Sequence, residues 1–504
     1  MRTAYTSDQI RAAELALMAK LPEGTLMERA AAGLAAVCAS LLSGTRGRVY
    51  GSRVVVLAGG GDNGGDALYA GARLARRGAR VTAVLAGSRT HEGGLAALIA
   101  AGGRAAPFEE EPARRLVGQA DVVMDGLVGI GGAGALREPY GTLAGLTGGT
   151  EGIVVAVDVP SGVDASTGRV EGPAVRAHMT VTFGAYKNGL LIDPGAEFAG
   201  AVELVDIGLG PHLPDPDVAA LARDDVAGLL PRPGAESDKY RRGVVGVVAG
   251  SDRYTGAAVL SAGGAVRAGA GLVRFASSGE PVRQVRARWP EAITTVLDPS
   301  SGPERVLDEV GRVQAWVLGP GLGTGSEAHV VAQAVLSTGL PVLVDADGLT
   351  LVAKDPALLR RSAPTVITPH AGELSRLLGV PRERIEARRL ENVRRAAAEL
   401  GVTVLLKGST TLIAEDGRPV RVNPTGTPWL ATGGTGDVLS GIAGALLAAG
   451  LSGYDAASCA AYTHGLAARA AARGGAGRGE EGRGEGPIAA LDVAQALPEA
   501  LRTL

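Results

Sequence analysis

Short apolar segments that end in glycine-rich turns alternate with amphipathic helical segments along most of this chain. In the first half the apolar segments are 53–59, 80–87, 121–129, 152–160, 179–184 and 201–208, with helical patterns such as 67–78 between them. Strands that are apolar throughout are typical of sheets buried on both faces, and helical crossovers make neighbouring strands parallel. The pattern therefore predicts an α/β fold, with a Rossmann-like three-layer arrangement in this half.

The same alternation starts again at residue 243, after a stretch with a different character. Residues 209–243 contain five prolines and no strand pattern, so we expect two domains, 1–215 and 222–504, to be joined there. The apolar segments of the second series are 243–251, 315–323, 340–349, 364–370 and 402–413, followed by the glycine-rich turn 431–437 and a helical segment. Ahead of the first strand, residues 7–42 have helical spacing, with Ser7 or Asp8 as the expected cap.

Composition excludes several classes of function. The 504 residues include 50 Lys and Arg and 52 Asp and Glu, a net charge of -2 that provides no basic surface for nucleic acid. No apolar segment reaches membrane-spanning length without glycine, charged or polar residues, and the N-terminal residues lack an export signal. Cys38 and Cys459 are predicted to be buried thiols in helices. We expect a cytoplasmic protein that binds neither nucleic acid nor a membrane.

Four turns of the first half carry polar residues at the ends of predicted strands. The turn 59–66 leads from a strand into a helix, a geometry that presents backbone N–H groups to an anion, although its spacing is not the dinucleotide fingerprint GxGxxG. The other turns are 125–132, 157–168 and 182–190. Because ligands of parallel sheets bind at the carboxyl ends of the strands, we expect four side chains to converge there: Asn63, Asp125, Asp158 and Ser161.

The sharpest local motif of the second half is GGTGD at 433–437, directly before a helix. Its N–H groups at Gly434, Thr435 and Gly436 would point to a transferring phosphoryl group, and Asp437 could accept the proton of an attacking hydroxyl. Further strand ends are 319–323, the paired acids of 345–349, 368–373 and 405–410. There we expect Lys407 to meet a phosphate and His370 to contact a ligand.

Together, the motifs of residues 1–210, including the opening YTSDQIRAAE, resemble the epimerase domain of bifunctional NAD(P)H-hydrate repair enzymes. The resemblance implies that the hydrated nicotinamide nucleotide is bound by Asp62, Asn63, Gly64, Gly65, Asp66, Gly129, Ile130, Gly131, Gly132, Ala133, Gly134, Ala135 and Tyr140. It implies that Asp158 contacts the reacting ring, where we expect it to act as general acid and base. It also implies a potassium ion held by Asn63, Asp125 and Ser161, whose oxygens suit such a cation.

Two residues depart from this family's usual pattern. Asp62 stands where the family usually has Asn, and Ala67 stands where it usually has Gly. A further carboxylate beside a phosphate-bearing ligand is unfavourable unless it turns outward or caps the following helix.

Residues 223–504 resemble a ribokinase-like fold, and their motifs match its NAD(P)H-hydrate dehydratase branch. The resemblance implies that the hydrated ring meets Gly256, Ala257, Gly323, His370 and Asp437. It implies that the adenine nucleotide meets Lys407, Gly408, Ser409, Thr410, Thr411 and Gly436. Members of the branch phosphorylate the ring hydroxyl and then eliminate phosphate, which is a better leaving group than hydroxide. Magnesium is expected with the nucleotide, although the sequence does not identify its ligands.

These resemblances predict a metabolite-repair enzyme. It would interconvert the R and S forms of hydrated NADH and NADPH, and then dehydrate the S form with ADP, giving AMP and phosphate. ADP is favoured over ATP because the fused arrangement looks prokaryotic. The preference between the two hydrated substrates and the presence of a homo-oligomer stay open.

Two alternatives remain beside this prediction. One is a ribokinase-type vitamin or sugar kinase with a non-catalytic N-terminal binding domain, which would release a stable phosphorylated product. The other is a binding or scaffold role for the first domain, disfavoured because Asp158 and the glycine turn are both present. The Gly-, Arg- and Glu-rich segment 473–487 is expected to be a surface loop.

Overall fold

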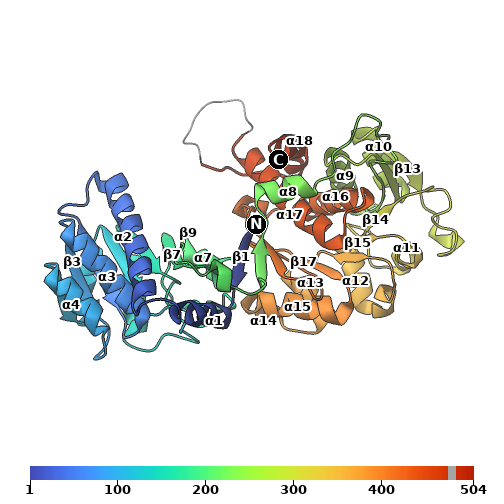
Figure 1. Cartoon of the computed structure of the whole chain (residues 1–504). Helices are drawn as coiled ribbons and strands as arrows, with labels where there is room; N and C mark the ends of the chain where they lie inside the picture. The colour runs from blue at the N-terminus through green and yellow to red at the C-terminus, as the bar shows by residue number, and fades with distance from the viewer. Residues whose placement is uncertain (475–483) are drawn as a thin grey trace. The chain divides into compact units, whose positions relative to one another are not determined.

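The computed structural model describes residues 1–474 and 484–504, so most of the expected surface loop 473–487 lies outside the described residues. The chain divides into two compact units, one of Arg2–Val218 and one of Ala219–Leu504 together with Met1 (Figure 1). Each unit contains its own large sheet.

The sheet of the first unit has seven strands, and all neighbouring pairs are parallel. From one edge to the other they are β4 (Arg104–Pro107), β3 (Arg80–Leu85), β2 (Arg53–Ala58), β5 (Val122–Gly126), β6 (Ile153–Val157), β7 (Met179–Phe183) and β9 (Ala201–Val205). The helices of this unit are α1 (Ser7–Met18), α2 (Thr25–Arg46), α3 (Asp62–Arg76), α4 (Glu92–Ala100), α5 (Glu110–Gly118), α6 (Tyr140–Leu146) and α7 (Gly195–Ala199).

Alternate residues of each central strand belong to different hydrophobic cores. On β2, Val54 and Val56 pack in a core with α2 and α3, whereas Val55 and Leu57 pack in a second core with α5 and α6. This division follows from the two-residue period of a strand. Because both faces are covered, the strands are apolar throughout, which confirms the predicted three-layer α/β fold.

The N-terminal region has the predicted helical pattern but a different cap. Residues 7–42 form two helices, because Pro22 and the left-handed Gly24 (φ 81°) separate α1 from α2. The cap of α1 is Thr6, not Ser7 or Asp8: its side chain accepts from Gln9 N in a capping box. Before it, the unpredicted strand β1 (Arg2–Tyr5) pairs with β8 (Tyr186–Lys187).

The sheet of the second unit is parallel in its first seven strands and ends in antiparallel strands. In order, its strands are β13 (Ile293–Val296), β12 (Leu272–Ser277), β11 (Val244–Val248), β14 (Ala315–Leu318), β15 (Val342–Val344), β16 (Thr365–Ile367), β17 (Thr403–Leu406), β18 (Thr411–Ala414) and β19 (Val420–Asn423). The predicted segment 402–413 is therefore two strands, β17 and β18, joined by a turn. A short strand, β10 (Val218–Ala220), also occurs in the stretch where none was expected.

Helices of the second unit supply most of its core. They are α8 (Arg223–Leu229), α9 (Thr255–Arg267), α10 (Gly279–Arg288), α11 (Ser326–Ser337), α12 (Asp347–Lys354), α13 (Ala371–Leu378), α14 (Arg382–Ala387), α15 (Arg389–Leu400), α16 (Thr435–Ala448), α17 (Gly453–Ala472) and α18 (Ala490–Arg502). Helices α9 and α16 approach closely, since a Cβ on Gly264 would lie 2.3 Å from the Val438 carbonyl oxygen. This contact fixes α16, the helix that begins at the GGTGD turn.

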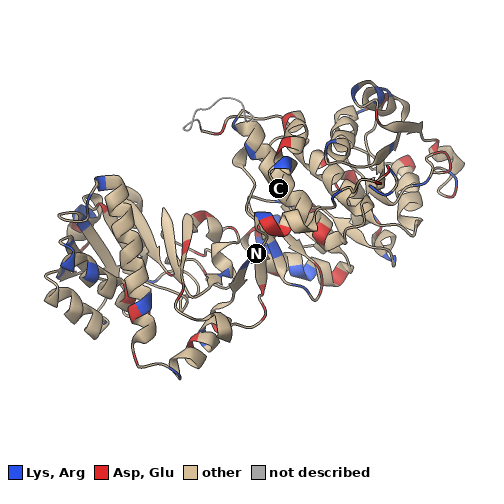
Figure 2. Cartoon of the chain, turned by 45° about the horizontal axis from the view of Figure 1, so that its top comes forward, with Lys and Arg blue, Asp and Glu red and all other residues tan. Residues whose placement is uncertain are grey.

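Among the described residues, one helix, α2, is long and apolar enough to cross a membrane. Its buried side chains, such as Leu34, Cys38 and Leu42, belong to the first core, which is the behaviour of a packed core helix. Cys38 and Cys459 are both fully buried, as predicted. Acidic and basic residues are interspersed over the helices and loops of both units (Figure 2).

Candidate active sites

The turns of the first unit meet at a topological switch point. From β2 the chain continues to β3 and β4 on one side, and the later strands β5, β6, β7 and β9 lie on the other. Ligands of open α/β sheets bind at such a point, outside the carboxyl ends of the strands. Asn63 lies in the first turn of α3, which follows β2, and Asp125 is the penultimate residue of β5. Asp158 and Ser161 lie in the turn that follows β6.

Asp125 and Ser161 form a buried polar pair at the ends of β5 and β6. Ser161 donates to Asp125 through its hydroxyl (Oγ to Oδ1, 2.6 Å) and through its backbone nitrogen (N to Oδ2, 2.8 Å). Burial raises the pKa of Asp125 to about 6, although the bonds from Ser161 oppose the shift. Asn63 lies beside the same loop, since a Cβ on Gly129 would be 2.9 Å from Asn63 Oδ1.

Asp158 is held by a buried cation. Its carboxylate oxygen Oδ1 accepts from Lys187 Nζ, from Phe183 N (3.1 Å) and from Thr182 Oγ1 (3.2 Å). The Lys187 side chain is only 1% exposed, and its ammonium group also donates to the Phe183 carbonyl (2.9 Å). Asp158 adopts a left-handed backbone conformation with φ 67°, which is uncommon for a residue with a side chain and typical of functional sites.

Further carboxyl groups surround Asp158. Burial, followed by the nearby charge of Asp158, raises the pKa of Glu14 to about 7. The same two causes raise the pKa of Asp66 well above its usual range, and Asp66 Oδ1 is buried without a hydrogen-bond partner among the described residues. Glu14 is on α1, whose Arg11 donates to the Ile130 carbonyl (3.2 Å) and so connects this helix to the 129–135 loop. Carboxyl groups with different proton affinities thus gather around Asp158.

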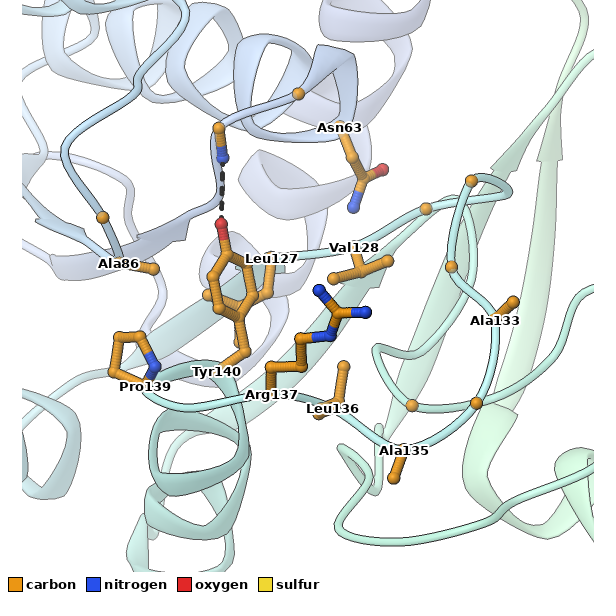
Figure 3. Close-up of a pocket in the computed structure, with 18 of the residues that line it drawn as sticks. Asn63, Ala86, Leu127, Val128, Ala133, Ala135, Leu136, Arg137, Pro139 and Tyr140 are labelled. Carbon is orange, nitrogen blue, oxygen red and sulfur yellow. Dashed lines mark hydrogen bonds between the residues drawn. The ribbon is translucent and has the colours of Figure 1, made fainter.

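A cavity of about 890 Å³ lies at the switch point (Figure 3). Its lining includes Asn63, Gly129, Tyr140 and the loop 131–135 from the predicted set. The hydroxyl of Tyr140 accepts from Gly60 N (3.3 Å), so that Tyr140 bridges to the glycine turn after β2. The remaining predicted contacts, Asp62, Gly64, Gly65, Asp66, Ile130 and Asp158, are not part of this lining.

The two departures from the family pattern have different consequences. Asp62 is exposed, and it lies near the carboxyl cluster around Asp158, since its charge contributes to the raised pKa values of Glu14 and Asp66. Ala67 is fully buried, and a Cβ on Gly126 would lie 2.5 Å from the Cβ of Ala67. The absence of a side chain at Gly126 therefore provides the room that Ala67 occupies.

The second unit has its own switch point between β11 and β14. Gly250 N donates to the Pro320 carbonyl (2.7 Å) and Ser251 Oγ donates to the Gly321 carbonyl (2.8 Å), which joins the two strand ends. The predicted ring-binding residues are close to this junction. A Cβ on Gly321 would lie 2.8 Å from Ala257 Cβ, Gly256 is its neighbour in the first turn of α9, and Gly323 N donates to Asp347 Oδ2 (2.9 Å).

The GGTGD turn lies beside Lys407 and Asp345. Gly434 is left-handed (φ 88°) and caps α16, which places Asp437 in the first turn of that helix. A Cβ on Gly436 would be 3.4 Å from Lys407 Nζ and 3.9 Å from Asp345 Oδ2. Lys407 Nζ bonds Asp345 Oδ1 (2.8 Å), and Ser440 Oγ donates to Asp345 Oδ2 (2.7 Å). Backbone N–H groups and an ammonium group therefore face one small region.

The pKa values of Asp437 and Lys407 suit a proton acceptor that lies beside a cation. Burial, then the neighbouring Asp345, raises the pKa of Asp437 to about 7, while Lys407 opposes the shift. Burial disfavours the charge of Lys407, but Asp345 and Glu373 outweigh it and raise the pKa, so the amine stays charged. A carboxyl group with a pKa near neutrality is suited to general base catalysis.

His370 caps α13 through its Nδ1 atom, which accepts from Gly372 N (2.9 Å) and Glu373 N (3.2 Å). Its side chain is 56% exposed, and its Nε2 atom is 3.6 Å from Glu373 Oε1. Burial of part of the ring lowers the pKa of His370 despite the charge of Glu373. The imidazole is thus oriented by the helix and keeps one nitrogen toward solvent.

The predicted nucleotide segment 407–411 forms the turn between β17 and β18, and a buried arginine supports it. Arg389 Nη2 donates to the carbonyls of Leu406 (3.3 Å), Lys407 (3.2 Å) and Thr410 (3.0 Å). Its guanidinium covers Gly408, where a Cβ would be 2.4 Å from Nη2. Glycine is therefore required at position 408 for this contact.

Comparisons with known proteins agree with both halves of this description. Residues 245–477 match a family model described as NAD(P)H-hydrate dehydratase, and residues 23–189 match one described as YjeF-related protein N-terminus. The chain is 48% identical over 473 residues to a bifunctional NAD(P)H-hydrate repair enzyme of Mycobacterium leprae, covering 93% of this chain and 94% of that protein. The chain belongs to the family of bifunctional NAD(P)H-hydrate repair enzymes.

Other members of this family and two solved structures extend the likeness. The repair enzyme of Mycobacterium tuberculosis is 48% identical over 91% of this chain and 92% of its own length. An ADP/ATP-dependent NAD(P)H-hydrate dehydratase of Bacillus subtilis, crystallised with ATP and Mg²⁺, covers 57% of this chain and 99% of its own (TM-score 0.51, 30% identity). A ribokinase-like protein of Enterococcus faecalis covers 57% and 96% (TM-score 0.50, 27% identity). The predicted ribokinase-like fold is thereby confirmed.

Sequence reasoning missed several residues of these sites. Lys187 lies within the predicted turn 182–190, but no known motif indicates that a lysine there pairs with Asp158. Glu14 and Arg389 are single charged residues within helices, where a solvent-exposed position is the ordinary expectation. Arg389 could have been found from its place in the helix just before β17, whose following turn it supports. Ser440 could have been found because it lies one helical turn after Gly436, on the same side of the helix.

Proposed function

We propose that the chain repairs hydrated NADH and NADPH, with epimerisation of the R and S forms in the first unit and dehydration of the S form in the second. The observation that carries the proposal is the presence of two carboxylate sites, around Asp158 and Asp437, each beside a glycine turn at the carboxyl ends of the strands of a parallel sheet. Membership of a repair-enzyme family supports the same division.

In the first unit, Asp158 is the proposed general acid and base. Epimerisation at the hydroxyl-bearing carbon requires a proton to move on and off nitrogen or oxygen while that centre opens and recloses. Lys187 compensates the charge of the carboxylate and, with Phe183 N, fixes its position. The loops 62–66 and 129–135 and the ring of Tyr140 would hold the nucleotide around it.

A potassium ion fits the residues between β2, β5 and β6. Among the described residues, Asp125 is a fully buried carboxyl without a cationic side chain bonded to it, and Asn63 Oδ1 lies beside the loop at Gly129. Asn63, Asp125 and Ser161 supply the oxygen donors that a hard cation prefers. Bound there, the ion would neutralise Asp125 and fix the loop that contacts the substrate.

In the second unit, Asp437 is the proposed base for phosphorylation of the ring hydroxyl. As Asp437 takes the proton, the hydroxyl oxygen bonds to the terminal phosphorus of ADP and AMP leaves. The turn at Gly434, Thr435 and Gly436 and the ammonium of Lys407 would stabilise the charge on the moving phosphoryl group. Loss of phosphate, together with a proton from the neighbouring ring carbon, then restores the ring double bond. Hydrated NADH and ADP give NADH, AMP and phosphate.

The nucleotide would lie over the turn 407–411, with the hydrated ring at Gly256, Ala257, Gly323 and His370. The crystallisation of the Bacillus subtilis dehydratase with ATP and Mg²⁺ supports an adenine nucleotide and magnesium for this unit. Within the described residues there is no cluster of three or more His, Cys, Asp or Glu side chains able to hold a metal. This agrees with Mg²⁺ that is bound mainly through nucleotide phosphates.

One assay tests the proposal as a whole. Purified protein is incubated with mixed R and S hydrates of NADH, Mg²⁺ and either ADP or ATP, and NADH absorbance and free phosphate are followed. We expect complete recovery of NADH with one phosphate per turnover, and ADP as the better co-substrate. Accumulation of a stable phosphorylated compound without NADH would instead support a ribokinase-type small-molecule kinase.

A further inference from the structure

The cavity of the first unit extends across several strand ends. At one end it is lined by Gly162, Val163 and Asp164, which follow β6, and at the other by residues 86–89, which follow β3. The sheet order β3-β2-β5-β6 separates these ends by three strand spacings, or about 14 Å at about 4.8 Å each. The cavity therefore fits an elongated ligand lying across the strand ends.

The proposed function determines which end of the cavity holds the nicotinamide half of the ligand, and the inference rests on the proposed function for this orientation. Asp158 and Ser161 follow β6, so the hydrated nicotinamide ring belongs at that end. The pyrophosphate then lies toward the middle, near the glycine turn after β2. The adenosine half reaches the end of β3, which is the second strand of the series β2-α3-β3.

The residues at the end of β3 are unlike those of a site for an unphosphorylated ribose. In dinucleotide-binding folds a carboxylate at the end of the second strand binds the ribose 2′-hydroxyl, whereas an arginine nearby accepts a 2′-phosphate. Here β3 is followed by Ala86, Gly87, Ser88 and Arg89, and all four line the cavity. The acidic residue nearest in sequence, Glu92, begins α4 and is outside the lining.

The backbone of Arg89 is held in place, but its guanidinium has no counterion among the described residues. A Cβ on Gly60 would lie 3.1 Å from the Arg89 carbonyl oxygen and 3.4 Å from Arg89 Cβ, so the backbone packs against the glycine turn. The Arg89 side chain is exposed and has neither an ion pair nor a side-chain hydrogen bond with any described residue. Its guanidinium is thus available to an anion at this end of the cavity.

We propose that Ser88 and Arg89 form a subsite for the 2′-phosphate of hydrated NADPH, so that the first unit prefers this substrate over hydrated NADH. Arg89 provides paired N–H donors for phosphate oxygens and Ser88 a hydroxyl. Hydrogen bonds to a charged group of this kind change affinity by roughly 10- to 100-fold.

Arg137 provides a matched control within the same cavity. It is also exposed and unpaired among the described residues, and its guanidinium extends between Tyr140 and Val128 (Figure 3). That position is midway along the cavity, where the pyrophosphate common to both substrates would lie. Removal of Arg137 should therefore affect both substrates alike.

The test compares the full-length protein with its Arg89→Ala, Arg89→Glu and Arg137→Ala variants. Epimerisation of hydrated NADPH and hydrated NADH is followed by separating the R and S forms, and binding of NADP⁺ and NAD⁺ is measured by calorimetry. We expect Arg89→Ala to lower the NADPH-to-NADH ratio of kcat/KM, and the NADP⁺-to-NAD⁺ affinity ratio, by roughly 10- to 100-fold. Arg89→Glu should lower both ratios further, and Arg137→Ala should leave them unchanged.

Two results would overturn the subsite: unchanged ratios in Arg89→Ala, or ratios that fall equally in Arg137→Ala. Failure of the proposed function looks different, because the unaltered protein would then epimerise neither substrate. In that case calorimetry still decides the subsite, since Arg89-dependent discrimination of NADP⁺ from NAD⁺ requires no catalysis.

Discussion

The two units use the same sheet geometry but treat their key carboxylates differently. In the first, Asp158 bonds directly to a lysine that is 1% exposed. In the second, the nearby Lys407 bonds Asp345 instead, and the pKa of Asp437 rises to about 7. Lys187 thus fixes the position of Asp158, and the raised pKa of Asp437 suits that carboxyl group to accept a proton near neutral pH. The two sites therefore differ mainly in the carboxylate that the lysine bonds: the proposed catalytic Asp158 itself in the first unit, and the neighbouring Asp345 in the second.

The largest expected effect comes from removing the base of the second unit. Asp437→Asn should lower nucleotide-dependent recovery of NADH by roughly 100- to 10,000-fold, the usual contribution of general base catalysis, and leave epimerisation intact. Because burial makes the ionised carboxyl unfavourable, the variant should unfold at the same temperature as the parent or higher. Loss of both activities in a folded variant would contradict the division between units.

Substituting the two lysines tests their different roles. Lys187→Met leaves Asp158 as an unpaired buried charge, so the first unit should lose about 3–5 kcal/mol of stability together with epimerisation. Lys407→Met leaves Asp345, whose side chain is 2% exposed, without its cation and should also destabilise its unit, but it should in addition raise the KM for the nucleotide. Denaturant unfolding and steady-state kinetics measure the two effects. An unchanged KM for the nucleotide in Lys407→Met would contradict the role of that lysine at the phosphate.

The pH dependence sharpens the comparison further. Asp437 must be ionised to accept a proton, and its folded-state pKa of about 7 lies above the ordinary 3.8. The rate of phosphate release should therefore fall about tenfold for each pH unit below about 7 and level off above it. In Asp437→Glu the pH at which the rate begins to fall should move. If another group were the base, the fall in rate near pH 7 would be absent. A rate of phosphate release that does not change between about pH 5 and about pH 8 would exclude Asp437 as the base.

The smallest effect concerns the cation. Replacing K⁺ by the smaller Na⁺ in the assay should lower epimerisation severalfold, because Asn63, Asp125 and Ser161 would fit it less well, and leave dehydration unchanged. Ser161→Ala should abolish this dependence. An identical response of both activities to the salt would place the effect outside the proposed potassium site.

The sequence predicts the architecture well because the strand pattern is strong and local. Fully apolar segments such as 53–59 and 315–323 became buried parallel strands at the expected places. The breaks were less predictable: Gly24 separates two helices through its left-handed backbone, and the turn 407–410 splits an apolar segment into β17 and β18. Both depend on one or two residues within a longer pattern.

The sites were only partly predictable for a different reason. Glycine turns and carboxylates at strand ends are visible as motifs, so Asn63, Asp158 and Asp437 could be named. The groups that control them come from distant segments: Lys187 is 29 residues from Asp158, and Lys407 is 62 residues from Asp345. Such partnerships follow from the order of strands in a sheet, which a single sequence does not give.

The central claim, that each unit performs one step, is tested most directly by supplying the R form of hydrated NADH to Asp158→Asn and Asp437→Asn proteins, separately and mixed. With Mg²⁺ and ADP, neither variant alone should return NADH faster than spontaneous epimerisation allows. The mixture should restore recovery, because the S form released by one protein is the substrate of the other. A mixture no better than its components, with both proteins folded, would contradict the claim.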